Sequence, residues 1–375
     1  MEKTNLKQLA GFFLKLGFTA FGGPAAHIAM MRQLAVVQNK WLTEEHFLDL
    51  LGATNLIPGP NSTEMAIHIG RERGGWKGLV IAGFCFIMPA VLITLCIAWL
   101  YKTYGHLPQV KPFIFGVQPA VIAVIIAAIY PLGKKSVKNI ELGIIGIAAL
   151  ACSLFGLSGI FVLFGSGFLE MGLAAIREKK TDKPVSLFPL LLGGTTSKGF
   201  FAALNIRLFL TFLKIGAILY GSGYVLFAIL DSELVARGII SRQQLLDAIA
   251  VGQFTPGPVF SSVTFIGYQV NNLNGAVIST IGIFLPSFLF VALLNPLVRK
   301  MRGSKLFAAF LNAVNVAAIA LIIAVCYQMG RASIINWQAI LIAVCSAFIL
   351  FKFPKVNSAL VILVGSVAGY FLLLL

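Results

Sequence analysis

The chain contains the stretch Asn55-Leu56-Ile57-Pro58-Gly59-Pro60 and, in its second half, the matching stretch Gln253-Phe254-Thr255-Pro256-Gly257-Pro258. Two prolines within three residues remove two backbone donors and push the residue before each proline out of the helical region. A helix therefore has to end at each stretch. Both lie in a chain that is 58% hydrophobic and only 11% charged, where a soluble domain carries about 25% charged residues.

Eight apolar runs surround these breaks, and a helix needs about 20 apolar residues to cross the hydrocarbon core of a bilayer. Several of the runs reach that length, and the shorter ones reach it only together with the residues that flank them. The composition and the runs together predict an all-α polytopic membrane protein. The runs are 78–100, 113–132, 142–155, 160–176, 276–294, 306–329, 334–351 and 358–375.

The two breaks belong to an internal repeat. Residues 13–17 read Phe-Leu-Lys-Leu-Gly and residues 212–216 read Phe-Leu-Lys-Ile-Gly, and further matches follow at offsets between 197 and 199. The predicted organisation is a first repeat over residues 1–176, a basic linker over 177–199 and a second repeat over 200–375. A single short match can arise by chance, but an ordered series of matches does not. We therefore predict the fold from the repeat.

The net charge of +16 comes mostly from basic residues in the loops between the apolar runs, so it does not indicate a nucleic-acid-binding surface. Where a loop of one repeat is rich in Lys and Arg, the equivalent loop of the other repeat is poor in them, and the richer repeat changes from one loop to the next. By the positive-inside bias, this pattern indicates that the two repeats have opposite orientations. We therefore expect inverted repeats, about ten transmembrane helices, a cytoplasmic linker and both termini outside. The basic loops are Arg71 to Lys77, Lys134 to Lys138, Arg177 to Lys183, Arg299 to Lys305 and Lys352 to Lys355.

The Pro-Gly-Pro segments are expected to be broken helices that enter and leave the membrane on one side, although a full crossing would make the repeats parallel. Asn61 and Glu64 form a capping pattern for a new helix over residues 62–70. A helix N-terminus inside the bilayer presents free N–H groups to an anion, and paired interrupted segments point to the site of a transporter. A kinked helix without any ligand is the simpler alternative for each break taken alone.

Further polar residues complete the candidate site. Lys15 and Lys214 are matched cations, which either snorkel to headgroups or attract an anion. The glycine-rich breaks at residues 21–24 and 220–223 either allow a close backbone approach or pack helices. His27 and Glu64 lack counterparts and are candidates for proton coupling, although Glu64 also suits a helix cap. The candidate substrate-binding residues are Lys15, Gly22, Gly23, Pro24, Asn55, Pro58, Gly59, Pro60, Asn61, Ser62, Thr63, Lys214, Gly221, Ser222, Gln253, Pro256, Gly257, Pro258, Ser261 and Ser262.

On these motifs the chain resembles the chromate ion transporter family in its long form, with two fused homologous domains. The resemblance rests on residues 12–17, on Phe21-Gly22-Gly23-Pro24 followed by His27, and on the two Pro-Gly-Pro stretches. It implies export of chromate across the cytoplasmic (inner) membrane, with sulfate as an isosteric competitor. The second repeat departs from the pattern, since residues 221–223 read Gly-Ser-Gly and Leu226 replaces His27. The two repeats are therefore not expected to contribute equally.

We expect a secondary transporter that holds a tetrahedral oxyanion between the repeats, without a cofactor or a metal. A passive anion channel with the same architecture, or a transporter of another oxyanion, is the alternative. An enzyme is not expected, because His27, Glu64 and His68 show no recognised catalytic spacing. The expected partners are a chromate or sulfate type of oxyanion, the lipid bilayer and a second copy of the chain in a homodimer, and no nucleic acid.

Overall fold

The computed structural model describes residues 4–21, 23–107, 109–177, 200–220, 223–293, 304–353 and 356–374, and within them it contains helices and turns but no strand. The all-α class is confirmed. The first repeat supplies α1 (Leu6–Thr19), α2 (Gly23–Arg32), the π-helical turn η1 (Gln33–Gln38), α3 (Glu44–Thr54), α4 (Asn61–Tyr104), α5 (Lys111–Ser136), α6 (Ile140–Leu154) and α7 (Gly159–Arg177).

The second repeat reproduces this order, including the π-helical turn. It supplies α8 (Phe200–Ile218), α9 (Gly223–Leu230), η2 (Asp231–Val235), α10 (Arg242–Phe254), the 3-10 turn η3 (Val259–Ser261), α11 (Ser262–Leu293), α13 (Lys305–Ser333), α14 (Trp337–Lys352) and α15 (Ser358–Leu374). Thr43 and Ser241 cap α3 and α10 at equivalent positions.

Five segments of the described residues are long and apolar enough to cross a membrane. They are Asn61–Tyr104, Lys111–Ser136, Gly159–Arg177, Val259–Leu293 and Lys305–Ser333. Three shorter apolar helices, Ile140–Leu154, Trp337–Lys352 and Ser358–Leu373, accompany them. With this composition and length, the chain is a multi-pass membrane protein.

The long helices α4 and α11 each reverse direction near one third of their length. In α4 the reversal occurs at Gly75, whose φ of 62° and ψ of −147° are outside the helical region. A Cβ on Gly70 would collide with the carbonyl of Gly78, so the two arms of α4 touch backbone to backbone. In α11 the reversal lies at Asn271 and Asn272, and Gly267 and Gly275 make the equivalent contact.

The Pro-Gly-Pro segments are re-entrant. His46, near the start of α3, lies 3.5 Å from the carboxylate of Glu72, near the end of the first arm of α4. Arg73 also donates to the carbonyl of Trp41 over 3.3 Å, just before α3 begins. The start of α3 and the end of this arm therefore lie side by side. The break at residues 55–60 is the tip of a helical hairpin that enters and leaves at one end of the bundle.

The opening segment, which the sequence analysis counts as a crossing, also doubles back. Arg73 binds both Thr4, before α1, and Trp41, after η1, so the two ends of the α1–α2 segment meet. In the described residues, four helical segments of each repeat run from one end of the bundle to the other: the second arm of α4 with α5, α6 and α7, and the second arm of α11 with α13, α14 and α15. The opening segment of the first repeat therefore enters and leaves at one end of the bundle.

Equivalent helices of the two repeats run antiparallel, as inversion predicts. Arg71, at the end of the first arm of α4 and next to the reversal at Gly75, donates to the carbonyl of Ala292, at the end of α11, over 2.9 Å. Lys102, at the far end of α4, donates to Asn272 over 2.8 Å, where the second arm of α11 begins. We call the end that carries Thr4, Trp41 and Arg73 the first end and the end that carries Lys102, Asn205 and Asn272 the second end.

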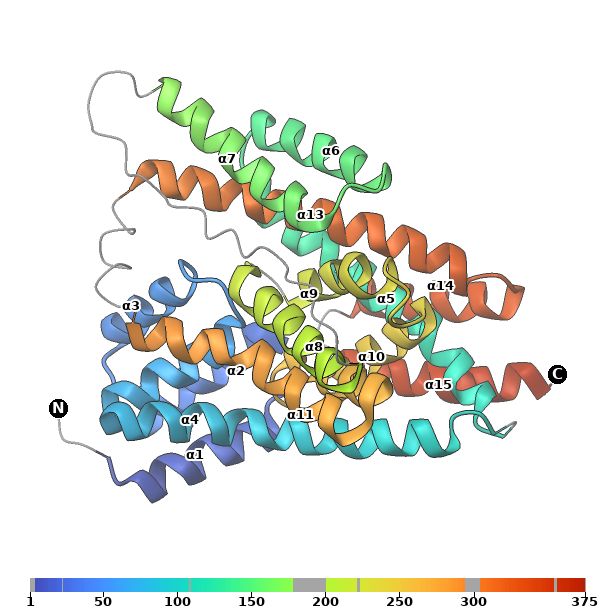
Figure 1. Ribbon diagram of the computed structural model, residues 1–375, viewed down its shortest axis with the longest axis horizontal. Helices are drawn as coiled ribbons and strands as arrows, with labels where there is room; N and C mark the ends of the chain where they lie inside the picture. The colour runs from blue at the N-terminus through green and yellow to red at the C-terminus, as the bar shows by residue number, and fades with distance from the viewer. Residues whose placement is uncertain are drawn as a thin grey trace.

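Figure 1 shows the N-terminal part of the chain on the left, at the first end, and the C-terminus on the right. The two termini are thus at opposite ends, and the expectation that both lie outside is wrong. Arg177 is at the first end, where it binds Glu141, whereas Asn205 is at the second end, where it accepts a hydrogen bond from Asn271. The predicted cytoplasmic linker falls outside the described residues.

The repeats interlock rather than pack as separate domains. The long helix α5 of the first repeat packs against α14 and α15 of the second, and α13 of the second packs against α6 and α7 of the first. Gly116 lies against the backbone of Gly365 and Gly369, which brings α5 and α15 into close contact. The centre of the bundle is therefore lined by both repeats.

Replacing Arg71 with alanine is expected to loosen the contact between the repeats. Its guanidinium donates to the carbonyls of Val291 and Ala292, in the last described turn of α11. A charge-assisted hydrogen bond contributes about 1.5–3 kcal/mol, so we expect the thermal midpoint to fall by roughly 3–6 °C. The measurement is thermal unfolding in detergent, with Lys77→Ala, an exposed neighbour, as the control. Equal midpoints for both variants would contradict the role of Arg71.

Candidate functional site

The two Pro-Gly-Pro tips are buried in the bundle, and each is held by the opposite repeat. The backbone N–H of Gly59 donates to the carbonyl of Leu219, at the end of α8, over 2.7 Å. The N–H of Gly257 donates to the carbonyl of Ala20, at the end of α1, over 2.9 Å. Each break thus caps the opening helix of the other repeat. All six residues of the two tips are buried.

His27 joins the opening segment to the first tip. Its Nε2 lies 3.1 Å from the carbonyl of Ala20, and its Nδ1 lies 3.3 Å from the hydroxyl of Ser62, at the start of α4. Because a carbonyl only accepts, Nε2 carries the proton, and Ser62 can donate to Nδ1 of a neutral ring. The Ala20 carbonyl accepts from both His27 and Gly257, so His27 and the second tip share one acceptor.

Glu64 lies in the first turn of α4 and is completely buried. A Cβ on Gly59 would collide with its carboxylate and would lie 2.8 Å from the hydroxyl of Ser287 on α11. The carboxylate therefore lies between the first tip and the second repeat. The Ser287 hydroxyl lies beside the Glu64 carboxylate, and among the described residues no cation pairs with Glu64. Buried polar atoms nearly always have partners, so this carboxylate is available to a ligand or a proton.

The start of α4 differs from the capping pattern expected from the sequence. The helix begins at Asn61 with Pro60 as its N-cap residue, and no side chain caps it. The amide of Asn61 donates to Asn55 over 2.8 Å instead. Thr63 and Glu64 donate their N–H groups to the Pro60 carbonyl. Glu64 is therefore not a capping residue.

The second tip is lined by hydroxyls. Thr94, from the second arm of α4, is fully buried and lies 3.5 Å from the Thr255 hydroxyl and 3.4 Å from the Ser261 hydroxyl. Ser262 replaces Glu64 here, and the helix starts with the 3-10 turn η3. The second tip therefore offers neutral hydrogen-bonding groups, whereas the first offers a carboxylate and an imidazole.

Comparison with known proteins assigns the family. The profile described as chromate transporter matches residues 7–171 and again residues 206–370. The chain belongs to the chromate transporter family.

Relatives of this chain differ in how much of it they match. A chromate transport protein of Cupriavidus metallidurans is 31% identical over 378 residues, which cover 97% of this chain and 92% of that protein. A probable chromate transport protein of Synechococcus elongatus is 29% identical and covers 97% of this chain and 95% of its own length. An uncharacterized transporter of Bacillus subtilis, YwrA, is 27% identical and matches 43% of this chain with 92% of its own length. No solved structure matches the chain.

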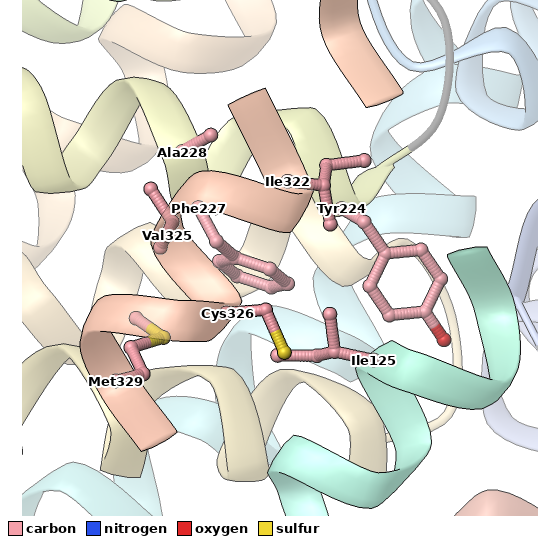
Figure 2. A pocket seen from close by; sticks show the side chains of 8 residues that line it. All are labelled: Ile125, Tyr224, Phe227, Ala228, Ile322, Val325, Cys326 and Met329. Atoms are coloured by element: carbon pink, nitrogen blue, oxygen red, sulfur yellow. The ribbon is translucent and has the colours of Figure 1, made fainter. Parts of the chain in front are cut away.

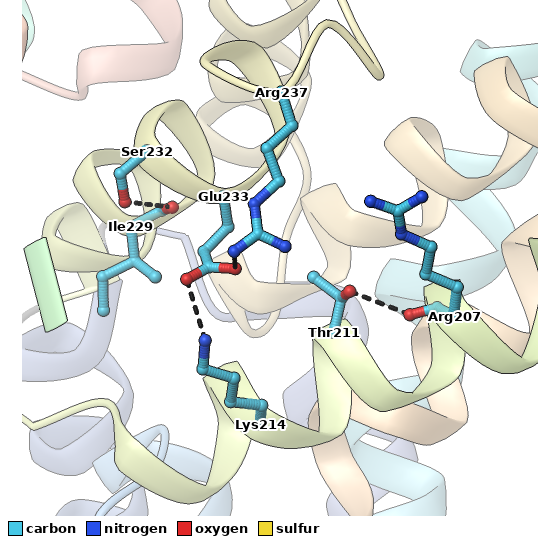
Figure 3. A network of polar contacts seen from close by, with 7 residues as sticks. All are labelled: Arg207, Thr211, Lys214, Ile229, Ser232, Glu233 and Arg237. Atoms are coloured by element: carbon cyan, nitrogen blue, oxygen red, sulfur yellow. Dashed lines mark hydrogen bonds and ion pairs between the residues drawn. The ribbon is translucent and has the colours of Figure 1, made fainter. Parts of the chain in front are cut away.

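The two matched lysines of this chromate transporter family member have different surroundings. Lys15 is exposed on the face of α1 that also carries the exposed Leu14 and Phe18. Lys214 donates to Glu233 over 2.9 Å, and Arg237 binds the other oxygen of the same carboxylate over 2.9 Å. Figure 3 shows Glu233 between these two cations. The equivalent positions of the first repeat are Leu34 and Gln38, so Lys15 has no such acid.

The remaining predicted residues divide between the centre and its margins. Ser62, Thr63, Ser261 and Ser262 are buried at the tips, Gly23 and Pro24 are half-buried, and Asn55 is exposed. Gln253 is half-buried and shares a hydrogen bond with Tyr224. Gly22, Gly221 and Ser222 fall outside the described residues.

A small apolar cavity of about 10 Å³ lies between α5, α9 and α13. Figure 2 shows that Tyr224, Phe227 and Cys326 line it. A space of this size holds at most a single water molecule. It therefore cannot take an oxyanion, and Cys326 serves as a small core residue here.

Sequence reasoning missed Thr94 and Ser287. Both are hydroxyl residues within apolar runs, and Val291 and Ala90 replace them in the other repeat. Their signal was this mismatch between the repeats, because each side chain packs against the tip of the opposite repeat.

Proposed function

We propose that this protein is a secondary transporter that exports chromate and holds the anion between the repeats, at the two Pro-Gly-Pro tips. The observation that carries the proposal is the crossed pair of hydrogen bonds, Gly59 to Leu219 and Gly257 to Ala20. Because each tip is bound to the opposite repeat, a rocking motion of one repeat against the other would move both tips. This is the geometry of alternating access in transporters with inverted repeats.

The donors at the tips suit a tetrahedral dianion. The start of α4 supplies the backbone N–H groups of Asn61 and Ser62 and the positive end of the helix dipole. The second tip adds the hydroxyls of Ser261 and Ser262. Gly59 and Gly257 have φ values of 139° and 91°, which keep the backbone free of side chains where the anion would approach. Sulfate has the same shape and charge, so we propose that it competes.

We propose that the first end faces the cytoplasm of a bacterial-type inner membrane. Arg71, Arg73, Lys138 and Arg177 belong to this end, and the positive-inside bias assigns such loops to the cytoplasm. An inside-negative potential then drives a negatively charged cargo outward by about 2.3 kcal/mol per charge at 100 mV. The membrane potential alone therefore favours export.

Glu64 is the proposed proton site. Its carboxylate lies in the same helical turn as the proposed anion site, and like charges disfavour each other strongly in a buried environment. A bound dianion should therefore favour the protonated form of Glu64. His27, which binds Ser62 in that turn, is proposed to relay the movement of the second tip to this site.

The direct test is transport by proteoliposomes that contain the purified chain, with chromate, sulfate, molybdate and phosphate supplied separately. We expect saturable chromate transport that sulfate inhibits and that phosphate, which is protonated at neutral pH, inhibits less. Labelled chromate should also exchange faster when unlabelled chromate is present on the opposite side. Transport that does not saturate and shows no exchange would instead identify the passive channel.

Replacing Lys15 with methionine is expected to weaken chromate transport through long-range attraction. The ammonium is exposed, so its effect should resemble electrostatic steering and disappear with salt. We expect kcat/KM to fall about threefold at low ionic strength and to match the parent chain at about 0.5 M salt. Lys7→Met, an exposed lysine nearer the first end, is the control. An unchanged kcat/KM at low salt would remove Lys15 from the site.

A further inference from the structure

A second cavity lies away from the Pro-Gly-Pro tips, toward the second end of the bundle. It has a volume of about 350 Å³ and lies between α4, α5, α10 and α15. Apolar side chains such as Val117, Val251 and Leu363 form most of its wall. This size is at the lower limit of small-molecule pockets, which are mostly apolar with a few polar groups.

One carboxylate lines this cavity. Asp247 is 4% exposed, and it accepts hydrogen bonds from the Tyr101 hydroxyl over 2.6 Å and from the Gln118 amide over 3.2 Å. Both donors are neutral. Among the described residues, no lysine, arginine or histidine forms an ion pair with Asp247. Buried carboxylates are normally paired with a cation, so this one lacks the usual compensation.

The walls of the cavity restrict which cation fits. A metal ion or a sodium ion requires several oxygen ligands, whereas the cavity offers the Asp247 carboxylate with the hydroxyls of Tyr101 and Ser366. A quaternary ammonium group requires no hydrogen bonds, and it is attracted to aromatic faces. Two aromatic residues, Tyr101 and Phe254, line the same cavity.

We propose that this cavity binds a small organic monocation with an apolar body, of the quaternary ammonium class, with Asp247 as its counter-ion. The site is separate from the oxyanion site, because none of the residues that line the cavity belongs to either Pro-Gly-Pro tip. A lipid acyl chain would fill the apolar wall but would leave the Asp247 charge uncompensated. The proposal therefore depends on the charge of the ligand and not only on its shape.

The test uses phenyltrimethylammonium and its uncharged isostere tert-butylbenzene, with the full chain in nanodiscs and ligand-observed NMR. We expect saturable binding of the cation and binding of the isostere at least tenfold weaker. Asp247→Asn should weaken binding of the cation at least tenfold. Asp49→Asn, which changes the exposed aspartate at the equivalent position of the first repeat, should leave it unchanged.

A second variant keeps the test independent of the folding of Asp247→Asn. Val251→Phe adds volume within the cavity but retains the carboxylate, so it should remove binding while the thermal midpoint stays close to that of the parent chain. Equal binding of the charged and uncharged probes, or full binding by either cavity variant, would overturn the proposal. Neither result would affect chromate transport, so the two proposals fail separately.

Discussion

Replacing Glu64 with glutamine is expected to uncouple chromate movement from the proton gradient. The amide has the size of the protonated carboxyl group but cannot release a proton, so the variant is fixed in the state that we propose to bind chromate. In the parent chain, an imposed gradient of two pH units should change the chromate flux by about tenfold or more, because one bound proton couples to it. In Glu64→Gln the flux should not respond to the gradient, while exchange of labelled chromate continues.

The control for this variant is Glu170→Gln. Glu170 is also a buried carboxylate, but it lies on α7 beside Arg177 and away from both tips. We expect its response to the gradient to equal that of the parent chain. A Glu64→Gln variant that still responds fully to the pH gradient would show that the proton binds elsewhere. Loss of both exchange and coupling, with a normal thermal midpoint, would instead make Glu64 essential for anion movement itself.

The sequence predicts the features that depend on local chemistry. Two prolines around Gly59 end a helix whatever surrounds them, and their recurrence around Gly257 reveals the repeat. The alternation of basic loops also predicts the inversion, which the pairing of Arg71 with the end of α11 bears out. These features can be predicted from the sequence because neither a proline break nor the charge of a loop depends on tertiary packing.

The features that depend on packing between the repeats were not predictable in this way. The opening segment has the length and apolar content of a span, and only the meeting of Thr4 with Arg73 shows that it returns. Lys15 and Lys214 look equivalent in sequence, but Glu233 pairs with one of them alone. Ser287 reaches Glu64 because α11 of one repeat packs against α4 of the other. A single repeat does not contain that information.

Replacing Gly59 with alanine is expected to cause the largest loss among the tip variants. Its φ of 139° is unfavourable for any residue with a side chain, at a cost of about 1–3 kcal/mol. The added Cβ would also collide with the carboxylate of the fully buried Glu64, which would have to shift. We expect chromate transport to fall by at least a hundredfold in proteoliposomes and the thermal midpoint to fall as well.

Two further variants separate backbone strain from the collision at Gly59. Gly75→Ala adds a side chain at a φ of 62° in open space, so it carries the strain without a collision, and we expect a much smaller loss. Glu64→Ser in the Gly59→Ala background introduces the residue that the second repeat has at this position, Ser262. This pair should recover the thermal midpoint but not the response to a pH gradient. If the midpoint does not recover, strain dominates. Recovery would show that Gly59 is required because the first repeat, unlike the second, keeps a carboxylate against its tip.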